Sequence, residues 1–392
     1  MYTPLNLYYF IKDFHNINNI SYSNNNYLKV LYKFYFIFKK FLKDTYKKEI
    51  NSPLLFVTYI EMDENIKILL DSEDNYNYFN NKDLFLKKLE NMKKVDITTN
   101  SVSEIFEFLL KSYYFDRKIL MEQISGIYSI ENWYKSKQVF KFNYDFFEEL
   151  KDTNCLELIK NNKEIFNFLQ YSDFYIDCSN LNFKIKNNEE VKGIFFSHYN
   201  DSKTINDDAN LFSDDDDNEK YRKDDYFNYL TITEIGKDNF PLYHYFLNLS
   251  QLKLDSKDYF TSIEECFSTY NDFKYILNIL YYLCSENKEI VLSKNKIPTH
   301  TIKNKKEKKD TKEIQMWDVG FRIGAAIHNY NKYVKLNESE TSGTGSKKRP
   351  HVRKAHWHRY KTKDGYILKW LHPIFVNEKF ADSDNMPVTF HK

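Results

Sequence analysis

The chain has 392 residues, 42% of them hydrophobic and 29% charged, which is enough for two or three domains with apolar cores. The formal net charge of +1 excludes a protein whose overall charge attracts a polyanion, so electrostatic binding must come from local clusters. The four cysteines, Cys155, Cys178, Cys266 and Cys284, are too widely spaced for a metal knuckle and predict buried thiols, not a disulfide scaffold.

The sequence also bears on where the protein acts. Its first residues lack the charged and then apolar layout of a signal peptide. The most apolar segment, YLKVLYKFYFIFKKFL, is interrupted by four lysines and is unsuited to crossing a bilayer. We therefore expect a cytoplasmic protein of the bacterial host cell, without membrane contact.

The first 302 residues are predicted to form a large, mainly helical region. Apolar residues recur at helical spacing in four stretches, residues 1–50, 102–125, 141–171 (more loosely) and 258–286. The sequence PLLFVTYIEM, which begins at Pro53, is rich in β-branched and aromatic residues and predicts a strand. Residues 200–225 are polar and acidic, and they predict a solvated loop within this region.

The run KNKKEKKDTK, residues 303–312, predicts a charged linker and a domain boundary. A long helix is predicted to follow, roughly from Thr311 to Leu336, with Asp310 and Glu313 at capping-box spacing. Gly320 and Gly324 would share one face of this helix. Because a glycine in a helix interior costs about 1 kcal/mol relative to alanine, close packing against the backbone is expected there.

Residues 343–372 are the most basic part of the chain, with nine Lys or Arg residues and a single acid, Asp364. The run SGTGS is followed at once by three cations, Lys347, Lys348 and Arg349. Backbone amides of a glycine-rich loop can hold a phosphate, but the run lacks the Walker spacing and a following helix. A plain connector is the alternative interpretation.

From His351 onwards the sequence alternates with period two, which predicts a strand. One face would carry Arg353, Ala355, Trp357 and Arg359, and the other face Val352, Lys354, His356, His358 and Tyr360. Asp364-Gly365 predicts a two-residue turn, and YILKWL predicts the returning strand. This register pairs Tyr360 with Lys369 and Arg359 with Trp370.

Three kinds of chemistry suit this predicted pair of strands, which we call the ribbon. A metal site would use His351, His356, His358 and His372, but no acid or thiolate completes the set, so no metal or other cofactor is expected. Metal-free RNA cleavage would use His356, His358, Arg359 and Tyr360. Binding of RNA or a ribonucleoprotein would use the cations on phosphates, with Trp357, Tyr360 or Trp370 stacking on bases. Alternatively, the tryptophans belong to the core and the cations form a solvated face.

Four strings in this part of the chain resemble the C-terminal domain of the type V-A anti-CRISPR family, found on phages and plasmids. They are GFRIGAAI (Gly320 to Ile327), SGTGSKKRPHVRKAHWH (Ser342 to His358), LKW (Leu368 to Trp370) and PIFVN (Pro373 to Asn377). The resemblance covers roughly residues 313–380. Lys354 and His372 depart from it, since the family pattern has Arg and Pro there.

The resemblance implies a non-enzymatic protein that inhibits a type V-A RNA-guided nuclease. It implies recognition of the N-terminal polypeptide of the effector during translation, followed by loss of the mRNA. The expected partners are thus a CRISPR effector, through its nascent peptide, and RNA or the ribosome, through the basic hairpin.

The predicted fold is α+β, with a large, mainly helical region (residues 1–302), a linker (303–312) and a small domain of one long helix plus a β-hairpin (313–392). Three other functions stay open at this point. They are direct inhibition of another effector such as a type VI nuclease, metal-independent RNA cleavage, and nucleic-acid binding by a plasmid protein.

Overall fold

The computed structural model describes residues 117–155, 163–185, 189–200, 228–236, 241–248, 273–294, 313–337, 351–363 and 365–376, and also Pro4, Leu5, Leu7, Tyr8, Tyr35, Lys39, Lys43 and Leu158. The chain divides into two compact units. Unit 1 comprises residues 1–136 and 195–262, and unit 2 comprises residues 137–194 and 263–392. The strand predicted after Pro53, the acidic loop at 200–225 and the linker at 303–312 lie outside the described residues, as does almost all of the helix predicted over residues 1–50.

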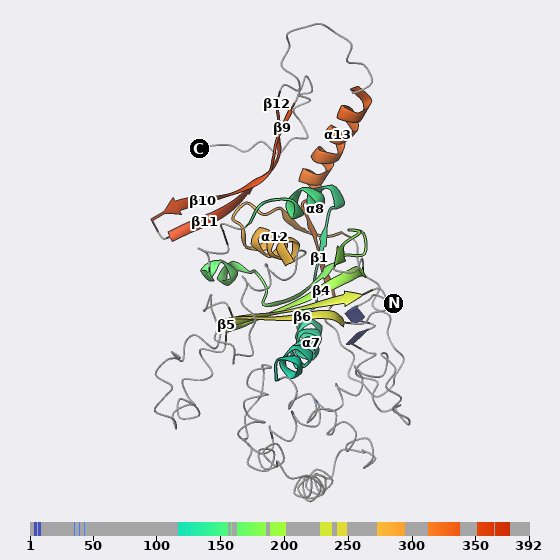
Figure 1. The fold of residues 1–392 in the computed structure, drawn as a ribbon, viewed down its shortest axis with the longest axis vertical. Coiled ribbons are helices and arrows are strands. Elements are labelled where there is room, and N and C mark those ends of the chain that lie inside the picture. Colours follow the sequence, from blue (N-terminus) through green and yellow to red (C-terminus); the bar gives the residue numbers. More distant parts are fainter. Residues whose placement is uncertain are drawn as a thin grey trace, which may run out of the picture. The chain divides into compact units, whose positions relative to one another are not determined.

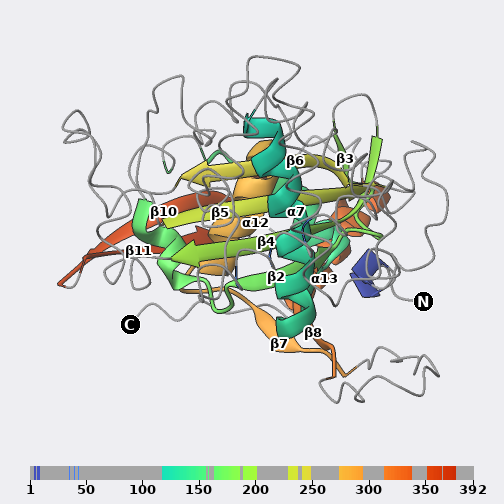
Figure 2. The same cartoon turned by 90° about the horizontal axis from the view of Figure 1, so that it is seen from below.

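Unit 2 contains the strands β2-β1-β8-β7 of a mixed sheet, in that order, and the first part of β4 next to β2, up to Ile194 (Figures 1 and 2). The strands are β1 (Gln138–Phe142), β2 (Asp173–Asp177), β4 (Glu189–Asn200), β7 (Ile290–Leu292) and β8 (Gln315–Val319), with the short β3 (Lys184–Ile185) paired to β4. β1 pairs in parallel with both β2 and β8, whereas β7 and β8 are antiparallel. Residues 315–319 therefore belong to a sheet whose central strand lies far earlier in the chain.

The helical elements of unit 2 are α8 (Tyr144–Lys151), the 3₁₀ helix η2 (Lys163–Phe168), α12 (Phe273–Cys284) and α13 (Phe321–Asn337). α12 is nearly all apolar and buried, and it contacts α8, η2 and the later strand β11 (Gly365–Leu371). Of the stretch with helical spacing at 258–286, residues 273–286 lie within the described residues and include α12. The helical prediction for 141–171 is wrong at its start, because Lys141 and Phe142 belong to β1.

The prediction of a helix from Thr311 is wrong at its N-terminal end. Residues 315–319 form β8, and the helix α13 begins only at Phe321. Gly320 lies before the helix with φ of 67°, a left-handed conformation that glycine adopts without steric cost. The buried carboxylate of Glu289 accepts hydrogen bonds from the amides of Arg322 (3.0 Å) and Ile323 (3.3 Å), so a residue distant in sequence caps α13.

The expected close packing against Gly324 is confirmed. A Cβ atom on Gly324 would lie 1.9 Å from Oδ1 of Asn143. That same Oδ1 accepts a hydrogen bond from the amide of Phe146 (3.1 Å) and caps the N-terminus of α8. The glycine thus allows α13 to approach the capped end of α8.

Unit 1 places α7 (Arg117–Ser136) against β5 (Asn228–Gly236) and β6 (Pro241–Asn248), and it also holds the part of β4 from Phe195 on, which neighbours β5 (Figure 2). The ring of Trp133 packs on Phe195 at 5.9 Å between centroids. Gly126 lies against the imidazole of His244, whose Nδ1 is 3.1 Å from Oγ1 of Thr233. Burial lowers the pKa of His244 to about 4, so this imidazole stays neutral in the folded protein.

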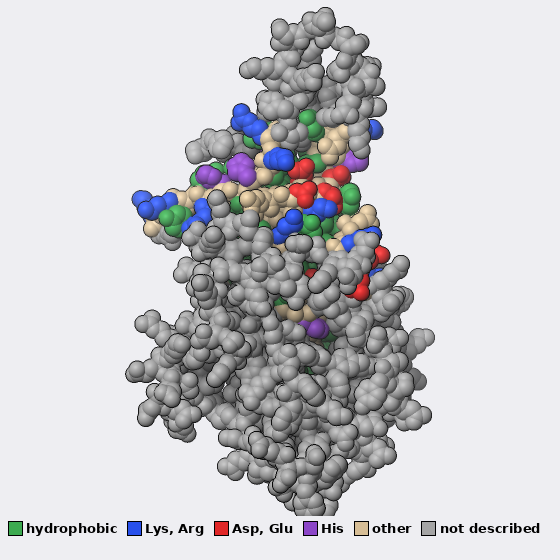
Figure 3. All heavy atoms as spheres, viewed as in Figure 1, with side chains coloured by type: hydrophobic (Ala, Val, Ile, Leu, Met, Phe, Trp, Pro, Cys, Tyr) green, Lys and Arg blue, Asp and Glu red, His purple; other side chains and the backbone are tan. Residues whose placement is uncertain are grey.

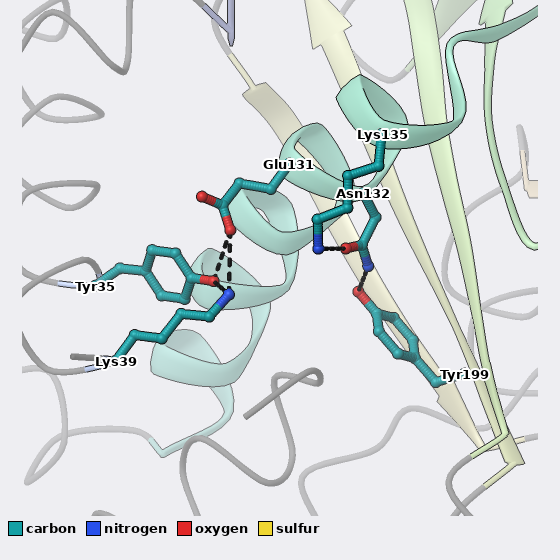
Figure 4. Close-up of polar contacts among 6 residues, drawn as sticks. All are labelled: Tyr35, Lys39, Glu131, Asn132, Lys135 and Tyr199. Atoms are coloured by element: carbon teal, nitrogen blue, oxygen red, sulfur yellow. Dashed lines mark hydrogen bonds and ion pairs between the residues drawn. The ribbon is translucent and has the colours of Figure 1, made fainter. Parts of the chain in front are cut away.

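Polar side chains also fix α7 within unit 1 (Figure 4). Tyr35 donates to the carboxylate of Glu131 at 2.7 Å, and the ammonium of Lys39 lies 3.4 Å from the same carboxylate. On the neighbouring residue of α7, Asn132 donates to the hydroxyl of Tyr199 at 3.1 Å. Burial raises the pKa of Tyr35 well above its usual value, so the phenol acts as a hydrogen-bond donor and not as a base.

The mixture of helices and strands expected for the chain is confirmed, in the form of a mixed sheet with helices. The expected helical character of residues 1–302 falls largely outside the described residues. Among the helices that the structure describes, none is both long and apolar enough to cross a membrane.

Candidate nucleic-acid interface

The basic segment forms two antiparallel strand pairs in unit 2 (Figure 1). β9 (His351–Arg353) pairs with β12 (Ile374–Val376), and β10 (His356–Thr362) pairs with β11. The predicted continuous strand from His351 is therefore wrong, since it is interrupted at Lys354 and Ala355. Each half of the segment has its own partner strand.

The predicted hairpin is confirmed, but its register differs from the prediction. Thr362 pairs with Gly365, so the two-residue turn comprises residues 363–364 and not Asp364-Gly365. Trp357 therefore lies opposite Trp370, and Arg359 lies opposite Leu368. This register places both indole rings at the base of the hairpin, where apolar burial favours it.

The base of the hairpin is fixed by hydrogen bonds from both tryptophans. Nε1 of Trp357 donates to Oδ1 of Asn278 on α12 at 2.9 Å, and the amide of Asn278 donates to the carbonyl of Thr153 at 2.8 Å. Nε1 of Trp370 donates to Oγ1 of Thr153 at 3.1 Å. Both indoles thus meet polar groups beside the C-terminal end of α8.

Trp370 is a core residue, with 1% of its surface exposed. Its ring packs edge-on against Phe146 and Tyr282. The backbone of Trp370 exchanges two hydrogen bonds with the side chain of Asn287, at 2.8 and 3.1 Å. Its ring is therefore not available to stack on a base, and the alternative in which the tryptophans belong to the core is correct for Trp370.

The hairpin tip has the opposite character. Its exposed side chains are Lys361, Lys363 and Tyr366, and the exposed His356 and His358 lie on the same hairpin nearer its base. Residues 356–371 carry four Lys or Arg residues and one acid, Asp364, which belongs to the turn and lies outside the described residues. In Figure 3, Lys and Arg side chains gather at the end of the hairpin, with histidines next to them. The tip therefore presents a local positive surface in a chain of almost zero net charge.

Two cation–π pairs order the tip. The guanidinium of Arg359 lies 4.5 Å from the centroid of Tyr366, and the ammonium of Lys369 lies 5.4 Å from that of Tyr360. The imidazole of His358 also contacts Tyr360 edge-on, at 4.3 Å between centroids. Such pairs hold charged side chains over rings and reduce the rotamer freedom lost on binding.

The remaining predicted binding residues divide into two groups. Arg353, at the end of β9, and Lys354 just after it are exposed; burial raises the pKa of Glu149, and the charge of Lys354 offsets part of that rise. Lys347, Lys348, Arg349 and the side chain of His351 lie outside the described residues. The structure thus places His356, His358 and Tyr360 on one face of the hairpin, and Arg359 on the other face with the anchoring Trp357 and Trp370.

Four further hairpin residues that could meet RNA, Lys361, Lys363, Tyr366 and Lys369, were not among the predicted binding residues. A signal for them was present, because extending the period-two alternation through YKTKDGYILK places a cation or a ring at most outward positions. The predicted register gave these residues the wrong neighbours on the opposite strand, since it paired Arg359 with Trp370.

The chemistry available in the described residues is limited. No group of three or more His, Cys, Asp or Glu side chains there is arranged to hold a metal ion. The three described cysteines are buried, and burial raises the pKa of the Cys155 thiol to about 12, which disfavours the nucleophilic thiolate. The exposed histidines of β10 have no carboxylate partner in the described hairpin.

Comparison with known proteins identifies a protein family whose model matches this chain. The model of the AcrVA2-like family, described as anti-CRISPR type V subtype A2, matches residues 140–378. No curated protein matches the sequence. A crystal structure of AcrVA2 aligns with 76% of this chain and 95% of its own, with 14% sequence identity and a TM-score of 0.41.

Proposed function

Because the chain belongs to the AcrVA2-like family of type V anti-CRISPR proteins, we propose that it silences a type V-A effector by recognising the nascent effector polypeptide and lowering its mRNA. The same membership favours a type V target over a type VI effector. In this proposal the protein acts inside the bacterial cell without enzymatic activity of its own.

The observation that supports the RNA part of the proposal is the exposed basic surface of the β10–β11 hairpin, whose described residues include no acid. We assign RNA or ribosome contact to His356, His358, Arg359 and Tyr360 there, together with Arg353 and the sequence-predicted Lys347, Lys348, Arg349 and His351. Trp357 and Trp370 hold the hairpin in place. Since phosphate contacts release counterions, binding must weaken steeply as salt increases.

Recognition of the effector peptide is assigned to the chain before residue 303, as the sequence predicts. Its aromatic residues suit a peptide groove, and its acidic run suits a peptide bearing Lys or Arg. Residues 303–312 remain the proposed boundary with the small C-terminal region.

The test is co-expression of the full chain with a type V-A effector whose first codons are recoded. Synonymous recoding should leave the loss of effector mRNA intact, because the polypeptide is what is recognised. Recoding to other amino acids should abolish it. If synonymous changes alone restore the mRNA, the RNA sequence is read directly and the proposal is wrong.

A further inference from the structure

The side chain of Tyr366 is 52% exposed although it belongs to a strand that is buried at its other end. It lies directly opposite Lys361 in the strand register, and Arg359 covers its ring at 4.5 Å. An aromatic ring is thus held at the surface between two cations, on the strand face that leads down to Trp357 and Trp370.

Arg359 has a hydrogen-bond donor that no described residue uses. Its Nε is shielded from solvent and finds no hydrogen-bond partner among the described residues. A guanidinium carries five donors in a rigid fork that matches a phosphate, and it remains able to stack on an aromatic ring. A shielded donor without an acceptor is unfavourable, and an arriving anion relieves that cost.

The spacing on this face suits successive nucleotides. Same-face side chains on one strand are about 6.6–6.8 Å apart, so Arg359 and Lys361 place two cations beside one ring. Unpaired bases stack on exposed aromatic side chains whatever their sequence, whereas bases within a duplex are already stacked on one another. The deep, narrow major groove of A-form RNA also excludes side chains from its bases.

We infer that the hairpin tip is a subsite for an unpaired nucleotide of single-stranded RNA. Tyr366 stacks on the base, and Arg359 and Lys361 contact the flanking phosphates. This inference rests on the proposed RNA contact and adds two features to it, a preference for unpaired RNA and a base-stacking residue. Tyr366 then takes the role that the sequence assigns to Trp370, whose ring is buried.

The test uses the full chain with a fluorescein-labelled 12-nucleotide RNA, either single-stranded or annealed to its complement, followed by fluorescence anisotropy. Tyr366→Leu keeps apolar bulk but removes the ring, and it should weaken single-strand binding about tenfold. Duplex binding should change less than about twofold, because only phosphate contacts remain. Tyr366→Phe should bind like the parent protein, since it retains the ring.

Tyr144→Leu is the matched control, because Tyr144 is an exposed tyrosine of α8 in the same unit, with 42% exposure. It should leave both affinities unchanged. Equal binding of single strands and duplexes, with Tyr366→Leu affecting neither, overturns the subsite but leaves the basic contact standing. Absence of binding to both probes overturns the proposed RNA contact itself. Thermal melting of each variant distinguishes a lost contact from a lost fold.

Discussion

At its base, the β10–β11 hairpin carries Trp357 and Trp370, which donate hydrogen bonds to Asn278 and Thr153 in the core. A few residues further along the same strands, Lys361 and Tyr366 lie at the surface. Both ends follow the same alternation and the same pairing. The difference between them lies in what α12 and α8 cover, so stability and partner binding should separate along the length of one hairpin.

The largest effect is expected at the base. Trp370→Ala removes a fully buried indole and leaves a cavity beside Phe146, which should lower the free energy of unfolding by about 3–5 kcal/mol. Chemical denaturation measures the change. The matched change at the tip, Tyr366→Ala, should cost less than about 1 kcal/mol, and equal losses at both positions would contradict the division between base and tip.

The next largest effect on stability is expected from His244 of unit 1. Its imidazole titrates, whereas the polar side chains that hold the hairpin base are neutral. Folding depresses the pKa of His244 from 6.5 to about 4, so the unfolded chain binds more protons between these values. The free energy of unfolding should therefore fall as the pH falls through this window, by up to about 3 kcal/mol.

Denaturation at several pH values checks this prediction. In the His244→Gln variant, the part of the pH dependence between about 6.5 and 4 that belongs to His244 should disappear. An unchanged profile in that variant would mean that other groups are responsible. Trp370→Ala should leave the profile unchanged, because no titratable side chain is removed.

A smaller loss is expected from Asn278→Leu at the base. This change removes the acceptor of Trp357 and the donor to the carbonyl of Thr153 while roughly preserving volume. Leaving such buried groups unpaired should cost about 1–3 kcal/mol. A stability equal to that of the parent protein would show that packing alone holds the hairpin base.

The smallest effect on stability is expected at the tip, from Lys361→Ala combined with Lys363→Ala. Exposed cations without an ion pair in the described structure should change the free energy of unfolding by less than about 0.5 kcal/mol. RNA affinity should nevertheless fall, and the slope of log K against log salt should become shallower by up to about 2. Unchanged affinity with an unchanged salt slope would place RNA contact elsewhere.

Local sequence patterns identified several features of unit 2 correctly. The alternation from His356 to Tyr360 predicted a strand with His and Trp on opposite faces, and the Asp-Gly pair predicted a hairpin within one residue of its turn. Gly324 predicted a close approach, which Asn143 makes. These features depend on spacing within a few residues, which a sequence records directly.

Contacts between distant residues were decided only by the tertiary structure. The β8 strand pairs with β1, and Glu289 caps α13, so a segment with helical spacing begins as a strand and acquires its cap from elsewhere. The hairpin register depends on burying Trp357 and Trp370 against α12 and α8. The sequence by itself determined which side chains alternate on the ribbon, whereas the packing of α12 and α8 decided which of them are covered and which remain free to bind, because burial depends on neighbours that lie far away in the chain.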